Sequence, residues 1–255
     1  MNEGFPILKM PSETTIDIWL IDLDSPLNPG VHLDKFLSLE ERNRAERYIF
    51  ARDAHRFTRC RAMLRLGLAC YLAKTPASIT FASNPYGKPR LAEPSALHFN
   101  VTHSGGLGLI AFATAGEVGV DVEAIRSNTG ALEIASEHFT KNEAAMIAAA
   151  PTPQEQASTF LRFWTRKEAV LKAAGCGLLM RLDLVDVSQA HLNLVRLDDS
   201  AGGSAETYWR VQDLDLMDGF TGAVAAPAGT LKVQQRRVRY EDLINGFAGN
   251  FAEQL

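Results

Sequence analysis

The stretch FWTRKEAVLKAAG, residues 163–175, forms the end of a long helix predicted over about 154–174. It places Trp164, Glu168 and Lys172 four residues apart, and side chains at that spacing share one face of a helix. A purely apolar row would indicate packing against a core. A carboxylate and an ammonium in line with a tryptophan fit either a functional face or a surface ion pair worth roughly 0.3 kcal/mol.

Outward from this helix, the chain alternates strand-like and helix-like segments. The expected strands lie over 14–23, 97–102, 107–114, 118–123, 181–188, 191–197, 207–216, 220–226 and 230–238. The first expected helix begins at a capping box formed by Ser38 and Glu41. The other expected helices run over 51–73, 130–138, 141–149, 154–174 and 240–251. The order strand, helices, strands, helices, strands predicts an α+β fold in two similar halves, 1–116 and 117–255.

The bulk composition argues against several classes of protein. The chain has 255 residues and a formal net charge of −4, which argues against wholesale binding of nucleic acid. No apolar run is long enough to span a bilayer, and the N-terminus has no pattern of a secretory signal. Cys60, Cys70 and Cys176 form no CxxC pair and fit a reducing compartment. We therefore expect a cytoplasmic protein with neither a membrane nor a nucleic-acid partner.

One segment is strongly basic despite the net negative charge. Residues 42–65 contain several arginines and no lysine, and their acidic residues are Glu46 and Asp53. The guanidinium group is a planar fork that suits phosphate and carboxylate. Spacing alone leaves two alternatives open, a phosphate-binding surface or the solvated outer faces of two amphipathic helices. The arginines are Arg42, Arg44, Arg47, Arg52, Arg56, Arg59, Arg61 and Arg65.

A pair of carboxylates lies in the segment GVDVEA, residues 119–124. On a strand, Asp121 and Glu123 point to the same face. Two adjacent carboxylates repel unless a proton or a cation lies between them, and hard oxygen donors suit Mg²⁺. A solvent-exposed sheet edge would show the same pattern. If the predicted helix packs over this strand, Glu168 supplies a third carboxylate and Lys167 and Lys172 supply positive charge near a phosphate, with Trp164 packed behind.

Polar residues also end the preceding predicted strand, in FNVTHSGG at 99–106. A hydrolase would use Ser104 as nucleophile and His103 as base, but adjacent residues on an extended chain point to opposite faces. Binding of a phosphate near the glycine turn is the better interpretation. Lys88, in the turn YGKP, is a second candidate phosphate contact.

Taken together, these pieces resemble a known family. FNVTHSGG, GVDVE and FWTRKEAVLKAAG resemble, in order and spacing, the three signature blocks of 4′-phosphopantetheinyl transferases of the Sfp type. YGKP (86–89) and DAHRF (53–57) also match features upstream of those blocks. The resemblance covers about residues 15–185.

The resemblance implies an activity and a set of roles. Such enzymes move the phosphopantetheine arm of coenzyme A to a serine of a carrier protein and release 3′,5′-ADP, a displacement at phosphorus. By resemblance, Asp121, Glu123 and Glu168 hold Mg²⁺, Glu168 takes the serine proton, and Lys172 contacts the pyrophosphate, so that Glu168, Lys172 and Asp121 are the catalytic set. The residues implied to bind coenzyme A are Arg44, Arg56, Asn84, Lys88, Pro89, Thr102, His103 and Lys172.

The resemblance also implies an architecture and a partner. We expect a monomeric pseudo-dimer of two α+β halves, with the active site in the cleft between them and an acidic acyl or peptidyl carrier protein as partner. Three positions depart from the family pattern: Thr102 replaces a usual serine, Glu41 lies where a basic residue is frequent, and Cys176 lies where a lysine is common. The first two departures concern the nucleotide end of the site, and the third concerns a carrier or phosphate contact.

Two rival functions compete with the transferase. A nucleic-acid-binding module would use the arginine segment with aromatic residues for stacking, but it leaves the carboxylates unexplained. A metal-dependent phosphohydrolase would use the same carboxylates with water in place of a serine. The sequence does not decide the carrier or its pathway, nor Mg²⁺ against Mn²⁺, since oxygen ligands accept both.

Overall fold

The computed structural model describes residues 6–27, 31–125, 130–177, 180–189, 195–197, 207–229 and 232–244. The fold combines helices with sheets, which is consistent with the predicted α+β class. Its strands are β1 (Thr15–Asp22), β2 (Phe81–Ser83), β3 (Pro89–Leu91), β4 (His98–Ser104), β5 (Leu107–Ala113), β6 (Gly119–Ala124), β7 (Val195–Leu197), β8 (Thr207–Asp213), β9 (Phe220–Pro227) and β10 (Lys232–Arg237). Its helices are α1 (Leu39–Ala45), α2 (Ala51–Leu72), α3 (Ala131–His138), α4 (Lys141–Ala148), α5 (Pro153–Ala174) and α6 (Tyr240–Ile244).

Two four-stranded sheets form the centre of the molecule. The first has the order β10-β1-β5-β4 and the second the order β6-β9-β8-β7, so that β4 and β6 are edge strands. Strand β10 pairs in parallel with β1, Ile18 lying opposite Gln235, although β10 comes from the end of the chain. The predicted division at residues 116 and 117 therefore does not separate the two sheets along the sequence, because the chain returns to the first sheet.

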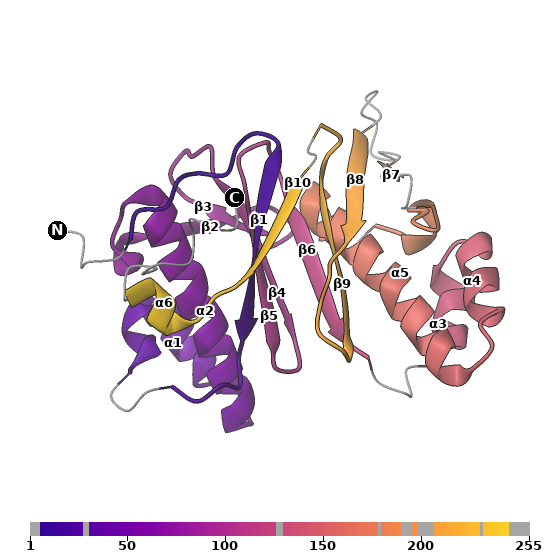
Figure 1. Cartoon of the computed structure of the whole chain (residues 1–255), viewed down its shortest axis with the longest axis horizontal. Coiled ribbons are helices and arrows are strands. Elements are labelled where there is room, and N and C mark those ends of the chain that lie inside the picture. Colours follow the sequence, from indigo (N-terminus) through magenta and orange to yellow (C-terminus); the bar gives the residue numbers. More distant parts are fainter. Residues whose placement is uncertain are drawn as a thin grey trace.

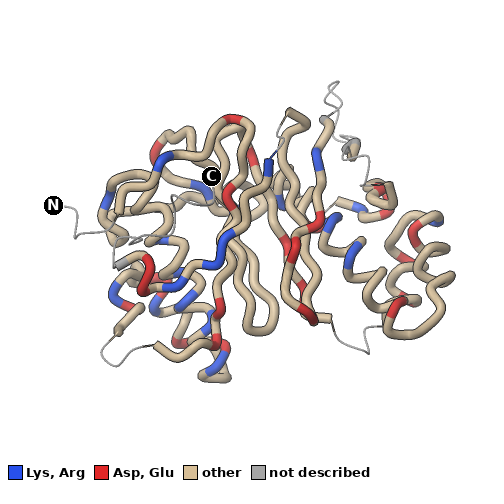
Figure 2. Tube along the Cα trace, viewed as in Figure 1, with Lys and Arg blue, Asp and Glu red and all other residues tan. Residues whose placement is uncertain are grey.

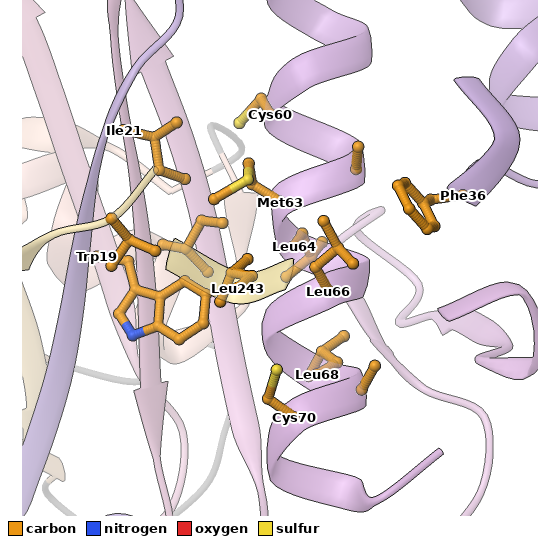
Figure 3. Packing of buried hydrophobic residues seen from close by; sticks show 14 of the residues in the cluster. Trp19, Ile21, Phe36, Cys60, Met63, Leu64, Leu66, Leu68, Cys70 and Leu243 are labelled. Carbon is orange, nitrogen blue, oxygen red and sulfur yellow. The ribbon is translucent and has the colours of Figure 1, made fainter. Parts of the chain in front are cut away.

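The first core lies between β1, β5 and the 22-residue helix α2. Because successive side chains on a strand alternate, Trp19 and Ile21 of β1 face α2 (Figure 3). The Trp19 and Phe112 ring centroids lie 5.2 Å apart in an edge-on arrangement. Helix α2 approaches these rings closely, since a Cβ atom on Gly67 would lie 2.7 Å from the Phe112 ring.

Two further cores complete the layers. The opposite faces of the two sheets pack on each other, Ile18 of β1 and Val120 of β6 belonging to one buried cluster. The 22-residue helix α5 covers the outer face of the second sheet, with Ala169 and Val170 in the third cluster. Figure 1 shows the resulting order, with α2 on one side, α5 on the other and the strands between them. The equivalence of the halves as a pseudo-dimer, with a site in the cleft, stays a prediction.

Most predicted elements are confirmed within two residues, including the capping box at Ser38 and the closure of α5 at Gly175. The strand expected over 181–188 is wrong, because the chain forms a 3-10 turn at Leu182–Leu184. Its alternating pattern arises because Val185 and Val187 are buried while the backbone pairs with no strand in the described part of the chain. Residues 191–194 and 245–251 of two further expected elements lie outside the described residues.

The arginine segment divides into an outer and an inner set. Arg42, Arg44, Arg47 and Arg52 are exposed, and Lys/Arg and Asp/Glu positions lie interspersed over α1 and α2 (Figure 2). Glu41, by contrast, is buried and accepts from two guanidinium groups, Arg61 at 2.5 Å and Arg65 at 2.6 Å. Against the opposing effect of burial, these two arginines lower the pKa of Glu41. The acidic residue at this position thus anchors α1 to α2.

Candidate active site

A glycine at the start of β6 brings α5 against the strand that carries the carboxylates. A Cβ atom on Gly119 would lie 2.0 Å from the Ala169 carbonyl oxygen and 2.3 Å from the Ala173 backbone nitrogen. Only a residue without a side chain permits this approach. Sequence reasoning overlooked Gly119 in GVDVE, although an isolated glycine in a strand often marks a close backbone approach. The contact fixes where the Glu168 and Lys172 face of the helix meets Asp121.

Gly119→Ala is therefore expected to separate the helix from the strand. We expect a loss of about 1–3 kcal/mol of stability from overpacking. At temperatures below the melting temperature, the transferase activity that the resemblance implies should fall about 10²-fold, because a displacement of about 1 Å misplaces reacting groups. Thermal unfolding and initial rates measure the two effects. Gly229→Ala is the control, since a Cβ atom there meets nothing within 4 Å, and equal behaviour of the two variants would contradict this account.

Asp121 is the most buried carboxylate of the candidate site. Its side chain is 5% exposed, and Oδ1 accepts from Lys172 Nζ at 2.6 Å and from Thr102 Oγ1 at 3.1 Å. Its Oδ2 atom is buried and makes no hydrogen bond within the described part of the chain. Burial raises the pKa of Asp121, with the charge of Glu123 adding to the effect, while Lys172 and Thr102 oppose it.

Glu168 brings a second unpartnered oxygen to the same place. Its Oε1 atom is buried and has no hydrogen-bond partner among the described residues. Burial raises the pKa of Glu168, and the nearby charges of Asp121 and Glu123 raise it further against Lys172. The helix carboxylate and the strand pair therefore lie within electrostatic reach of one another. Glu123 accepts from Ser104 Oγ at 2.7 Å.

The donor set fits a hard divalent cation. Asp121 and Glu168 each have one buried carboxylate oxygen without a hydrogen-bond partner among the described residues. Proteins bind Mg²⁺ through one or two carboxylates, and water molecules complete its coordination shell. In the described part of the chain, however, no three acidic, histidine or cysteine side chains form a ready-made ligand cluster. One Asp121 oxygen is instead occupied by the ammonium of Lys172. Binding of a cation by all three carboxylates stays a prediction.

Lys172 forms a pair with the strand rather than with its own helix. Its Nζ atom donates to Asp121 and lies 3.3 Å from Thr102 Oγ1 and 3.4 Å from the Val120 carbonyl oxygen. The alternative of a plain surface pair between Glu168 and Lys172 is therefore not what the structure forms. The Trp164 ring packs on Phe160 and Phe139, with ring centroids 5.9 and 6.4 Å apart.

Lys167 does not contribute charge to the site, and that expectation is wrong. Its ammonium is fully buried, 2.7 Å from Glu143 Oε2, and donates to the carbonyl oxygen of Leu182 at 2.8 Å. The physical reason is helix geometry, because a neighbour in sequence lies about 100° around the axis. Lys167 therefore points to the core while Glu168 and Lys172 point to β6.

His103 lies within electrostatic reach of two cationic side chains, Arg56 and Lys172. Partial loss of hydration, and then the charges of Arg56 and Lys172, lower the pKa of His103. The Arg56 guanidinium makes a two-pronged ion pair with Asp24. His103, one of the predicted nucleotide contacts, is thus within electrostatic reach of Arg56 and of Lys172. Arg44 is exposed and lies over the Phe57 ring, 5.2 Å from its centroid.

Asn84 and Lys88 connect the first half to the end of α5. Asn84 Nδ2 donates to the carbonyl oxygen of Gly175 at 2.7 Å, and its Oδ1 accepts from the Lys88 backbone at 2.9 Å. Lys88 Nζ pairs with Glu117 and donates to the carbonyl oxygen of Ala173 at 3.1 Å. Both side chains are therefore bonded within the chain, and their contacts to a nucleotide stay predictions, as does that of Pro89 in β3.

Comparisons with known proteins agree with this geometry. Residues 117–226 match the model of the 4′-phosphopantetheinyl transferase superfamily, and residues 31–115 match that of the 4′-phosphopantetheinyl transferase N-terminal region. The chain is 32% identical to 4′-phosphopantetheinyl transferase HetI of Nostoc over 213 residues, 82% of this chain and 86% of HetI. The chain belongs to the 4′-phosphopantetheinyl transferase superfamily.

Further relatives support the same assignment. The chain is 35% identical to slr0495 of Synechocystis over 202 residues, 78% of this chain and 80% of that protein. It is 29% identical to 4′-phosphopantetheinyl transferase Sfp of Bacillus subtilis over 231 residues, 89% of this chain and 99% of Sfp. The chain is thus a transferase of this class, as its three sequence blocks indicated. None of its described helices is long and apolar enough to cross a membrane.

Proposed function

We propose that this transferase moves the 4′-phosphopantetheine arm of coenzyme A to a serine of an apo acyl or peptidyl carrier protein, releasing 3′,5′-ADP in a Mg²⁺-dependent reaction. One observation carries the metal part of the proposal. Asp121 Oδ2 and Glu168 Oε1 are buried without hydrogen-bond partners in the described chain, and burying such oxygens is costly unless something compensates them. Asp121, Glu123 and Glu168 would hold the ion, with Mn²⁺ as an alternative occupant.

The chemistry follows from what these side chains can do. The carrier serine Oγ bonds to the phosphorus that carries pantetheine, while the bond from that phosphorus to the bridging oxygen breaks and 3′,5′-ADP leaves. Glu168 would accept the serine proton, because a carboxylate oxygen beside the attacking hydroxyl can act as a general base. The bound cation would neutralise charge on the pyrophosphate. The Lys172 ammonium, which donates to Asp121 in this structure, would contact the pyrophosphate when coenzyme A is bound.

Basic and polar groups of the first half would hold the nucleotide. The 3′-phosphate and adenosine end would meet His103, Arg56, Arg44 and Lys88, and the pocket would be lined by Thr102, Asn84 and Pro89. The charges of Arg56 and Lys172 near His103 support this placement, since clustered cations attract a polyanion. Exposed arginines on α1 and α2 would also favour an acidic carrier. We further propose a cytoplasmic monomer, with the active site in the cleft between the two halves.

Mass spectrometry of the carrier tests the proposal directly. The protein is incubated with coenzyme A, Mg²⁺ and one of several apo carrier proteins, and we expect the carrier to gain the mass of one phosphopantetheine group. A carrier with its acceptor serine changed to alanine, and a reaction with EDTA, are the controls. Release of nucleotide without any mass gain would support a phosphohydrolase instead. No gain with any carrier would count against the transfer.

A further inference from the structure

The edge strands β4 and β6 belong to different sheets, yet side chains of β4 join them. Alternate residues Asn100, Thr102 and Ser104 share one face of β4. Asn100 Oδ1 accepts from the backbone nitrogen of Val120 at 2.9 Å, and Thr102 donates to Asp121 at 3.1 Å. These are two of three side-chain links between β4 and β6, which connect the two sheets where their strands are not paired through the backbone.

The third link is made by Ser104, and the donor and acceptor in each of its hydrogen bonds can be assigned. The backbone N–H of Ala124 donates to Ser104 Oγ at 3.1 Å, so the hydroxyl is the acceptor in that bond. A hydroxyl has one proton, and here it is left to donate to Glu123 Oε2, 2.7 Å away. The Ser104 hydroxyl is thus held by the backbone of β6 and in turn holds the Glu123 carboxylate on the same strand. The other Glu123 oxygen carries no hydrogen bond from this serine.

We propose that Ser104 is a positioning residue for the metal site, holding the Glu123 carboxylate in the orientation in which it would bind the cation. This inference rests on the proposed function, since it takes Glu123 as a ligand. The hydroxyl acts through Glu123 and touches neither substrate nor ion. It also gives Ser104 of FNVTHSGG a use that does not require a nucleophile, because the serine proton is committed to the carboxylate.

Metal binding by the coenzyme-free protein tests the proposal without any turnover. Titration of Mn²⁺ by electron paramagnetic resonance should show about tenfold weaker binding for Ser104→Ala, because residues that orient a ligand typically contribute 10–100-fold to metal affinity. Ser104→Thr retains the hydroxyl and should bind within about twofold of the parent protein. Glu123→Gln should also weaken binding, and adding Ser104→Ala to it should weaken binding no further.

A merely structural role gives a different result. Ser188→Ala removes a buried hydroxyl, which accepts from Asn142 at 2.9 Å, and should lower the melting temperature without changing the Mn²⁺ affinity. Unchanged affinity in Ser104→Ala, or losses that add to those of Glu123→Gln, would overturn the positioning role while leaving the transferase proposal intact. Absence of divalent-cation binding by the parent protein would overturn both the positioning role and the proposed metal site.

Discussion

Asp121→Asn is expected to abolish phosphopantetheine transfer while leaving the fold in place. Asparagine has nearly the same shape as aspartate, and its amide oxygen can still accept from Thr102 and Lys172, which lie 3.1 and 2.6 Å from the present carboxylate. The substitution removes one of three negative charges proposed to bind the cation. Loss of one strong electrostatic contact of this kind costs about 10²–10³-fold in rate, and loss of the ion would cost more.

Two measurements on Asp121→Asn separate binding from catalysis. Carrier mass gain per unit time should fall at least about 10³-fold at saturating coenzyme A, and Mn²⁺ titration should show the cation bound weakly or not at all. Thermal unfolding should remain close to that of the parent protein. The exposed Asp34, changed to asparagine, is a charge-matched control and should leave transfer unchanged. Turnover near the parent rate would remove Asp121 from the metal site.

Local patterns predicted which candidate side chains share a face, because that part of the geometry is local. The spacing of Asp121 and Glu123 on a strand, and of Glu168 and Lys172 on a helix, determines which side chains share a face. Bringing the two faces together needs a close packing of helix on strand, and that depends on one glycine, Gly119. Its significance is visible only once the partner backbone is known, since no pattern within six residues specifies what lies across from it.

Long-range pairing explains what the sequence did not predict. The alternating pattern of β10 identifies a strand, but nothing in it selects β1, more than two hundred residues earlier, as its partner. The arginine segment shows the same limit. Residue type cannot distinguish Arg65, which is buried against Glu41, from Arg44, which is exposed, because the difference lies in the partner each side chain meets. Burial of Lys167 was predictable from its position on the helix, and counting its charge toward the site ignored that position.

Replacing Lys167 by methionine should lower the free energy of unfolding more than the Gly119→Ala or Asp121→Asn substitution does. Lys167 and Glu143 are both fully buried and 2.7 Å apart, and Glu143 also accepts from the backbone of Val187 at 2.8 Å and of Thr140 at 3.0 Å. Burial lowers the pKa of Lys167, whereas the charge of Glu143 opposes that shift. Removing one member of a buried pair leaves the other uncompensated, at a cost of about 3–5 kcal/mol.

The double variant shows whether the two charges act as a pair. For a chain of this size, the single substitution Lys167→Met corresponds to a fall of roughly 6–20 °C in melting temperature. Combined with Glu143→Gln, which keeps a group able to accept from Val187 and Thr140, the loss should be smaller than the sum of the single losses by at least about 1 kcal/mol. Calorimetry or denaturant unfolding measures each value. Arg162→Met, at an exposed position on the same helix, should change stability by less than about 0.5 kcal/mol.

The same variant also tests the separation of the two lysines by function. Because the three N–H donors of the Lys167 ammonium are directed to Glu143 and to the carbonyl oxygens of Leu182 and Val185, none is left to bind a phosphate. At a temperature well below its melting point, Lys167→Met should therefore keep the parent KM for coenzyme A, whereas Lys172→Met should raise KM or lower kcat by about 10²-fold through loss of a contact to the pyrophosphate. An increase in KM in the Lys167 variant equal to that of the Lys172 variant would mean that the buried ammonium acts on the nucleotide after all, and that α5 rotates when coenzyme A binds.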